Sequence, residues 1–245
     1  MQPKPINIPI EMCQSALMNK TVRELQVFIW LKMYCSGKLK ITAEVLRNIM
    51  ADLGISSVKT VWVGINSLLN KGWITLSRRS GYYFIRSFER IRELEGFSKR
   101  TGAEFSFRDI KNFKGFLVGA VISQLIAVQK KKEWLLVTER IKGRSLTVTS
   151  IPHLYYPVAN DALAKILGVS KSTAYEWKQL ARKQGFIKIR RKYRKLGYLD
   201  TGNINQYKKY GDMTAGRICF REGKYYEQLA DTVYSKIVLK SRKNW

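Results

Sequence analysis

The stretch LGVSKSTAYEWKQLARKQGFIKIRRKYRK, from Leu167 to Lys195, predicts two helices and a basic strand. Gly168 permits a tight turn at the end of one helix, and the hydroxyl group of Ser170 caps the next. Gly185 ends that second helix, and the alternating apolar and basic residues of IKIR predict a strand after it. The segment is therefore interpreted as helix, turn, helix and basic strand.

A weaker version of this pattern, LGISSVKTVWVGINSLLNKGWITLSRR, occupies Leu53–Arg79. Twelve positions separate Thr60 from Gly72, and twelve also separate Thr173 from Gly185. An aromatic residue and an isoleucine follow each of the two glycines, as expected for the start of a strand that closes a core. The chain therefore contains two copies of one pattern.

Aligning the copies on their glycines predicts which helix face is buried. We expect that face to pack on the preceding helices, and it carries Val61, Gly64, Ile65 and Leu68 in the first copy and Ala174, Trp177 and Ala181 in the second. Lys178, which aligns with Ile65, is the expected exception.

The opposite face of each helix supplies the candidate DNA-binding residues. These are Lys59, Thr60, Trp62 and Asn66 in the first copy, and Lys171, Ser172, Tyr175, Gln179 and Arg182 in the second. Amide side chains can pair with adenine and cationic side chains with guanine, whereas hydroxyl groups suit phosphates. A solvated helix face is the alternative, but residues 171–195 contain ten Lys or Arg and one acid, Glu176. The two aromatic residues fit a core position equally well.

Basic residues in the strand regions extend the candidate site. They are Arg78 and Arg79 in the first copy, and Lys188, Arg190, Arg191, Lys192, Arg194 and Lys195 in the second. We expect them to contact the DNA backbone or a minor groove. A solubilising basic strand is the alternative.

Helix signals also precede the first copy. TVRE at Thr21–Glu24 is typical of a capping box, Thr42 is a candidate N-cap, and Ser56 is expected to cap the helix that Gly72 ends. WITLS, the turn RRSG and YYFIR then predict a β-hairpin. A further helix is expected over Ser87–Glu95.

The second half has a similar order of signals. A long helix is expected from about Phe113 to Lys131, and Asn160 or Asp161 is expected to cap the helix that ends at Leu167. Residues 133–150 fit a strand pair around Lys142 and Gly143, although their first half also fits an extension of the long helix. Residues 200–245 suggest a strand pair and a helix.

These elements predict a mainly α fold with small β wings, built as two winged helix-turn-helix domains. The expected organisation is an N-terminal arm (1–20), a first domain (21–95), a linker (96–112), a second domain (113–200) and a basic C-terminal extension of that domain (201–245).

Charge is the unusual feature of the composition. Lys and Arg number 45 and Asp and Glu 18, so the net charge is +27. This excess favours a polyanionic partner, because neutralising phosphates releases condensed counterions. We expect nucleic acid, with an anionic membrane surface or packing inside a virion or ribosome as alternatives.

Cysteine and histidine usage points away from disulfides and metals. Cys13, Cys35 and Cys219 are odd in number and far apart, and His153 is the only histidine. We expect reduced thiols, no metal and no cofactor. No signal-peptide pattern is visible, and the apolar stretch 116–128 is too short to span a bilayer. The expected location is therefore the cytoplasm, on the nucleoid or a mobile-element replicon, without a membrane partner.

The quoted LGVSKSTA…GFI unit resembles the winged helices of bacterial, plasmid and phage replication initiators and of transcriptional regulators. Two such units in one chain, with a long helix before the second, are similar to plasmid replication initiators of the two-winged-helix type and to phage replication organisers. The resemblance covers about 50 residues in each half. It implies sequence-specific binding of double-stranded DNA, and a partner among replication or transcription proteins.

No enzymatic activity is expected. Rolling-circle nicking requires two metal-bound histidines beside a tyrosine, and neither GxxxxGK[ST] nor GxSxG occurs in the sequence. A two-metal nuclease built from dispersed acidic residues stays open. Three roles are considered: a replication initiator or organiser of a phage or plasmid, a transcriptional regulator, and a structural protein of a virion that uses its charge alone.

Overall fold

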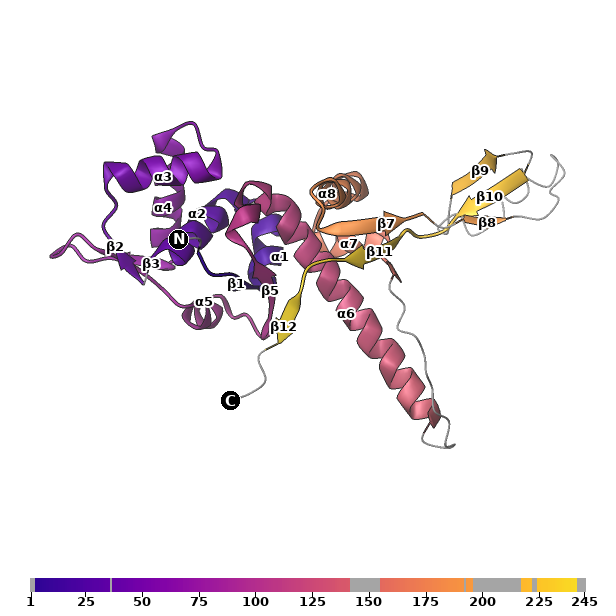
Figure 1. The fold of residues 1–245 in the computed structure, drawn as a ribbon. Helices are drawn as coiled ribbons and strands as arrows, with labels where there is room; N and C mark the ends of the chain where they lie inside the picture. The colour runs from indigo at the N-terminus through magenta and orange to yellow at the C-terminus, as the bar shows by residue number, and fades with distance from the viewer. Residues whose placement is uncertain are drawn as a thin grey trace.

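The structure, a computed structural model, describes residues 3–35, 37–141, 155–191, 193–195, 217–221 and 224–241. Figure 1 shows helices joined by short strands, and the described strands form three-stranded sheets. The expectation of a mainly α fold with small β elements is therefore confirmed.

The first set of elements, called unit 1, contains three helices followed by a β-hairpin. In chain order these are α2 (Val22–Tyr34), β2 (Lys38–Leu39), α3 (Ala43–Leu53), α4 (Val58–Asn70), β3 (Ile74–Leu76) and β4 (Tyr83–Ile85). The strands pair in the order β2-β4-β3, all antiparallel. The expected hairpin is confirmed.

The second set, unit 2, repeats this order. It contains α6 (Phe113–Ile141), β6 (Tyr156–Pro157), α7 (Asn160–Leu167), α8 (Lys171–Lys183), β7 (Ile187–Arg190) and β11 (Thr232–Ser235). The strands pair in the order β6-β11-β7, again antiparallel. In both units the strand that comes last in the chain lies in the middle of the sheet.

The C-terminal segment differs from the expected extension. Its strand β11 is the middle strand of the unit 2 sheet, and Val233 pairs with both Tyr156 and Ile189. Between β7 and β11 the chain forms a second small sheet, in the order β8-β10-β9, from β8 (Tyr193–Lys195), β9 (Arg217–Arg221) and β10 (Lys224–Gln228). The expected helix is wrong for residues 224–241, which contain strands and connecting segments.

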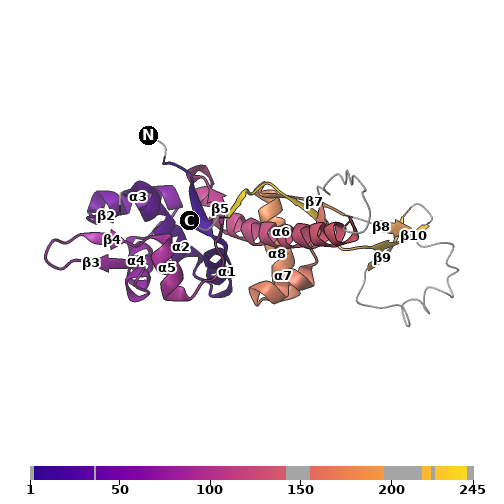
Figure 2. The ribbon, with the colours of Figure 1, turned by 90° about the horizontal axis from the view of Figure 1, so that it is seen from below.

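The expected N-terminal arm and linker are also wrong, because both are built into the core. Residues 1–20 contain β1 (Ile6–Pro9) and α1 (Ile10–Met18), and residues 96–112 contain β5 (Thr101–Phe105) and a 3₁₀ helix, η1 (Phe107–Asn112). A sheet in the order β1-β5-β12 joins them to β12 (Leu239–Ser241). Ile8 and Ala103, which pair across this sheet, are fully buried. Figures 1 and 2 show the sheet between units 1 and 2.

Helix α6 forms the centre of the core of unit 2. Phe113, Phe116 and Leu117 are buried, and the rings of Phe116 and Phe186 meet edge to face with centroids 5.8 Å apart. The segment Phe107–Lys132 is long and apolar enough to cross a membrane, but 61% of its apolar 18-residue stretch is buried inside the protein. The core helix of a soluble protein has the same properties, so this burial agrees with the expected buried helix. Helix α6 continues through Ile141, so residues 133–141 extend the long helix and do not form a strand.

Several helix ends follow the predicted signals. Thr42 caps α3, Ser87 caps α5 (Phe88–Glu95) and Ser170 caps α8, each with its side-chain oxygen. Other ends differ. Thr21 precedes α2 without a side-chain cap, so the capping box is not formed. Helix α4 begins after Ser57 rather than Ser56, and α7 begins at Asn160 after Ala159.

Candidate nucleic-acid interface

The start of α8 is fixed by a turn and a cap. Gly168 ends α7 with a left-handed φ of 62°, which glycine adopts at no steric cost. Ser170 Oγ then accepts a hydrogen bond of 3.1 Å from the backbone N–H of Thr173. On the inner face of α8, Ala174 and Ala181 are fully buried. The rotation of α8 about its own axis is therefore set by this packing.

The outer face of α8 presents most of the predicted site residues to solvent. Lys171, Ser172, Tyr175 and Arg182 are exposed, and Gln179 is half-buried. Lys171 Nζ lies 3.0 Å from Asp161 Oδ2, and both side chains are largely exposed. An exposed ion pair of this kind contributes little to stability, so Lys171 can exchange Asp161 for a phosphate.

Lys178 is the clearest departure from the sequence interpretation. The alignment of the two copies predicts that Lys178 does not belong to the buried face of the helix, yet its side chain is only 1% exposed. Its ammonium group donates to the carbonyl oxygen of Val158 at 2.7 Å and lies 3.4 Å from both Asn160 Oδ1 and Asp231 Oδ2. Burial lowers the pKa of Lys178, and the Asp231 carboxylate opposes that shift. Lys178 thus occupies the position of Ile65 because these oxygens satisfy its charge.

Trp177 is not fully buried as the alignment implied. The side chain is half-buried and packs against the edge of the core. Lys114 Nζ of α6 lies 4.6 Å from the centroid of its ring, within the range of a cation–π interaction. Trp177 therefore faces the start of α6.

Helix α4 exposes the predicted residues with much less charge. Lys59, Thr60 and Asn66 are exposed, whereas Trp62 is half-buried and packs against the core. Val63 is 58% exposed on the same helix. Because Lys59 is the one cation in α4, the face of α4 offers hydrogen bonds and apolar contacts rather than strong attraction to phosphates.

The hairpin of unit 1 carries a larger basic cluster than the sequence indicated. Arg78 and Arg79 are exposed in the loop between β3 and β4. Next to this loop, the ammonium groups of Lys38 and Lys40 lie 5.7 and 5.0 Å from the ring centroid of Tyr82. Lys38 and Lys40 are not among the residues predicted from the sequence, because β2 is only two residues long and gives no strand signal of its own.

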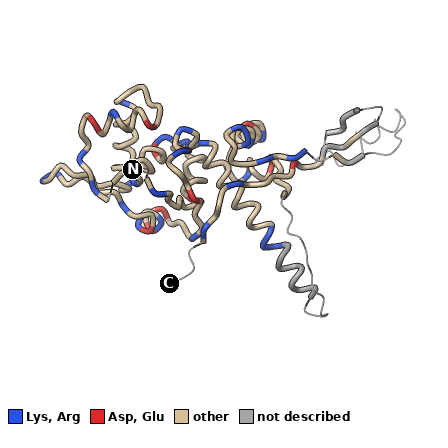
Figure 3. The backbone as a smooth tube through the Cα atoms, in the orientation of Figure 1, with Lys and Arg blue, Asp and Glu red and all other residues tan. Residues whose placement is uncertain are grey.

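In unit 2 strand β7 follows the predicted alternation. Ile187 is buried, Lys188, Arg190 and Arg191 are exposed, and the Arg190 guanidinium lies 4.6 Å from the ring centroid of Tyr155. Figure 3 shows basic residues along α8 and β7. Lys192 lies outside the described residues. Arg194 and Lys195 lie in β8, which pairs with β10 and not with the sheet of β7.

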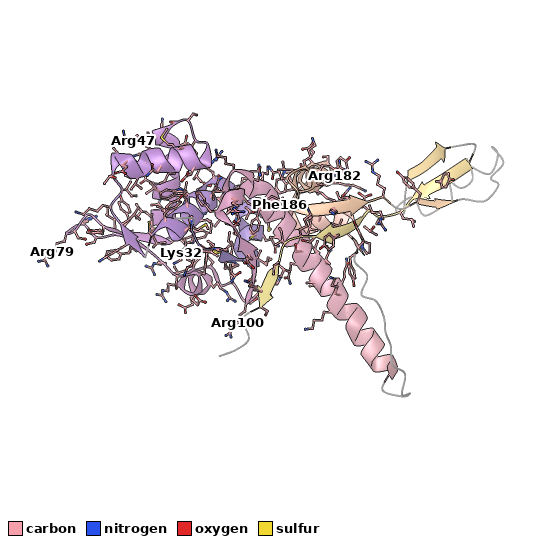
Figure 4. All side chains as sticks on the ribbon, in the orientation of Figure 1. Lys32, Arg47, Arg79, Arg100, Arg182 and Phe186 are labelled. Carbon is pink, nitrogen blue, oxygen red and sulfur yellow. The ribbon has the colours of Figure 1, made fainter. Side chains whose placement is uncertain are left out.

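The predicted residues do not form one continuous patch. Figure 4 shows Arg182 of α8 and Arg47 of α3 on the same side of the molecule, with Arg79 at the far end of the unit 1 hairpin. Arg47 is exposed and was not among the predicted residues. Arg100 lies on the opposite side from Arg182.

The described residues contain neither a metal-binding cluster nor a disulfide. Within the described ranges no three His, Cys, Asp or Glu side chains converge on a point that could hold a metal ion, and His153 lies outside those ranges. The described cysteine side chains, Cys13 and Cys35, are free, and burial raises the pKa of the Cys35 thiol to about 11. Comparison with protein-family models, curated proteins and solved structures found no match.

Proposed function

We propose that this chain binds double-stranded DNA through two winged helix-turn-helix units, with α4 and α8 as the helices that enter the major groove. The observation that carries the proposal is the repeated topology. Each unit has the order helix, strand, helix, helix, strand, strand, and each sheet has its last strand in the middle. In winged helices the third helix of this order reads base edges.

Exposure and charge on α8 support this role. Its inner face is held by alanine packing, so Tyr175 and Arg182 are directed to solvent on a rigid element. Glu176 is the one acid from residue 171 to residue 195. Arginine can pair bidentately with guanine, and the half-buried Gln179 can pair with adenine at the edge of the contact.

The strands that follow each reading helix would contact phosphates. Arg78 and Arg79 in unit 1, and Arg190 and Arg191 in unit 2, are exposed in or next to the strands that follow their reading helices. Cations of this kind position a protein on the duplex and add affinity without reading sequence. Because α4 has a single cation, we expect unit 2 to supply the larger share of the affinity.

The role that we propose is initiation or organisation of replication on a phage or plasmid. It rests on the resemblance of the repeated unit to such proteins. Two reading helices on one chain would allow an asymmetric or directly repeated site to be bound without a symmetric dimer.

A selection of bound fragments from a random duplex library tests the proposal. It is run at about 150 mM salt, where nonspecific binding is weak, with single-stranded DNA and RNA as competitors. We expect an enriched duplex motif with two boxes, centred about 10 base pairs or a multiple of this apart. No enriched duplex motif, or a preference for single strands or RNA, would contradict sequence-specific duplex binding.

A further inference from the structure

A basic cleft lies where α1, α2, η1, α6 and α8 meet. It has a volume of about 540 Å³, within the range of about 300 to 1,000 Å³ that is usual for small-molecule sites. Four cationic side chains line it: Lys20, Arg23, Lys111 and Lys114. No Asp or Glu is among the described residues that line it.

The apolar part of the lining makes the cleft more than a charged surface. Leu17, Phe113 and Trp177 contribute to its wall. Lys114 Nζ lies 4.6 Å from the centroid of the Trp177 ring, which holds the ammonium group at the cleft. A wall of this kind lowers the local dielectric constant and strengthens the attraction of the cations for an anion.

Hydrogen bonds fix the position of the α2 side of the cleft. The Arg23 guanidinium donates to Gln26 Oε1 at 2.9 Å and to the carbonyl oxygen of Leu53 at 3.3 Å. Gln26 Nε2 in turn donates to the carbonyl oxygen of Ile110 at 2.6 Å. These bonds join α2 to the end of α3 and to η1, so the cleft is preformed.

The charges of the cleft lysines are not neutralised by acidic side chains of the described residues. Within the described chain, Lys20, Lys111 and Lys114 form no ion pair. Lys20 also has a φ of 57°, and among the described residues other than glycine it alone has a positive φ. A side chain with a Cβ adopts this conformation at a steric cost. Asparagine would fit the same backbone better, yet the position carries a cation.

We propose that this cleft binds a nucleotide, with its phosphates among Lys20, Lys111 and Lys114 and its apolar part against the half-buried Trp177. The nucleotide can belong to a free nucleoside triphosphate or to a nucleic-acid strand that enters the cleft. Both present the same phosphate chemistry to the same lysines. The inference does not depend on duplex reading by α4 and α8.

The test is direct binding to the full-length protein with two probes. One probe is ATP, titrated calorimetrically, and the other is a fluorescent single-stranded oligonucleotide, titrated by anisotropy. The cleft variant is Lys111→Gln combined with Lys114→Gln. The matched control is Lys131→Gln combined with Lys132→Gln, which removes two exposed cations outside the cleft from α6, the helix that carries Lys114.

Lys20→Asn provides a second cleft variant that keeps the fold. Asparagine tolerates a positive φ better than lysine, so we expect the melting temperature to be unchanged or raised. A loss of binding in this variant therefore reports the missing cation rather than unfolding.

We expect both cleft variants to bind at least one probe about tenfold more weakly than the control does, since each removes charge-assisted hydrogen bonds. A loss confined to ATP identifies a free nucleotide as the ligand, and a loss confined to the oligonucleotide identifies a strand. Equal binding by cleft and control variants, or no binding of either probe by the unaltered protein, would overturn the inference. Because neither probe requires a particular duplex sequence, failure of the library selection leaves this result intact.

Discussion

The ammonium group of Lys178 in α8 lies 3.4 Å from Asp231 Oδ2, across 53 positions of sequence. Asp231 immediately precedes β11, so this pair joins the proposed reading helix to the strand that completes the sheet of unit 2. The Lys178 side chain is 1% exposed and that of Asp231 is 11% exposed. A pair at this depth is costly to break, because the partner left behind is a buried charge without compensation.

Lys178→Met should lower the free energy of unfolding by about 3 kcal/mol, the usual cost of leaving one buried charge unpaired. Adding Asp231→Asn should restore most of this loss, since the amide carries no charge. Urea denaturation of the single and double variants measures the coupling. Ile65→Met, at the matching position of α4, is the control and should cost less than about 1.5 kcal/mol. Additive losses in the double variant would show that the two groups are not coupled.

The stability of the protein should depend on pH through Lys178. Burial lowers its pKa in the folded protein below the ordinary value of 10.5. Between the lowered pKa and 10.5, the unfolded chain binds more protons than the folded one, so this contribution to stability increases as pH rises. The difference in unfolding free energy between the unaltered protein and Lys178→Met, measured from neutral to alkaline pH, should therefore grow in favour of the unaltered protein. A constant difference would exclude this contribution.

At Gly119, helix α6 packs closely against Ile237 and Phe186. A Cβ at this position would lie 2.8 Å from Ile237 Cδ1 and 3.0 Å from Phe186 Cβ. The methyl group of Ile237 can move, but Phe186 Cβ is fixed to its backbone, so Gly119→Ala should cost about 1 to 3 kcal/mol. Gly115→Ala is the comparison, because there the added Cβ meets the far end of the flexible Gln184 side chain. Thermal unfolding should show the larger loss for Gly119→Ala.

Gln179→Ala tests base reading by α8. If its amide pairs with adenine, the variant should lose about 1 to 3 kcal/mol of discrimination at one base pair of the selected site. Lys183→Ala, a change of an exposed cation on the same helix, should weaken binding to all sequences alike. Affinities for a set of single-base variants of the site distinguish the two patterns. A uniform penalty for Gln179→Ala would remove it from the reading residues.

The exposed arginines after α8 should act on phosphates. Arg190→Ala combined with Arg191→Ala should weaken binding to all duplex sequences and reduce the slope of log affinity against log salt by about one unit per lost contact. The control is Lys99→Ala combined with Arg100→Ala. It also removes two positive charges, but Arg100 lies on the side of the molecule opposite Arg182. The two variants are compared in salt titrations. Equal slopes for the two variants would contradict the phosphate assignment.

Local signals in the sequence determined much of the secondary structure. Glycines with a left-handed backbone conformation end α3, α5 and α7. Thr42 caps the start of α3, Ser87 that of α5 and Ser170 that of α8. The twelve-residue spacing in the two copies predicted the matching helices α4 and α8, and the alternation around Ile187 predicted the exposed cations of β7. These features depend on a few neighbouring residues, which is why they can be read from the chain alone.

Long-range packing decided what the sequence could not. Residues 1–20 and 96–112 look polar or irregular in sequence, yet β5 pairs with β1 on one side and with β12, from the other end of the chain, on the other side. Ile8 of β1 and Ala103 of β5 thereby enter the core. Strand β11 becomes the middle of the unit 2 sheet, although 41 residues, 191–231, separate it from the end of β7.

The sequence by itself therefore determined most of the helices in the two units, the caps at Thr42, Ser87 and Ser170, the repeat and the excess of positive charge, because each is encoded in local residue type and spacing. Only the tertiary structure decided that Lys178 is buried against Val158 and Asp231, and that Lys20, Lys111 and Lys114 surround one cleft. The physical reason is that a cation is stable in a core, or directed into a cleft, only where distant segments bring oxygens or an apolar wall to meet it.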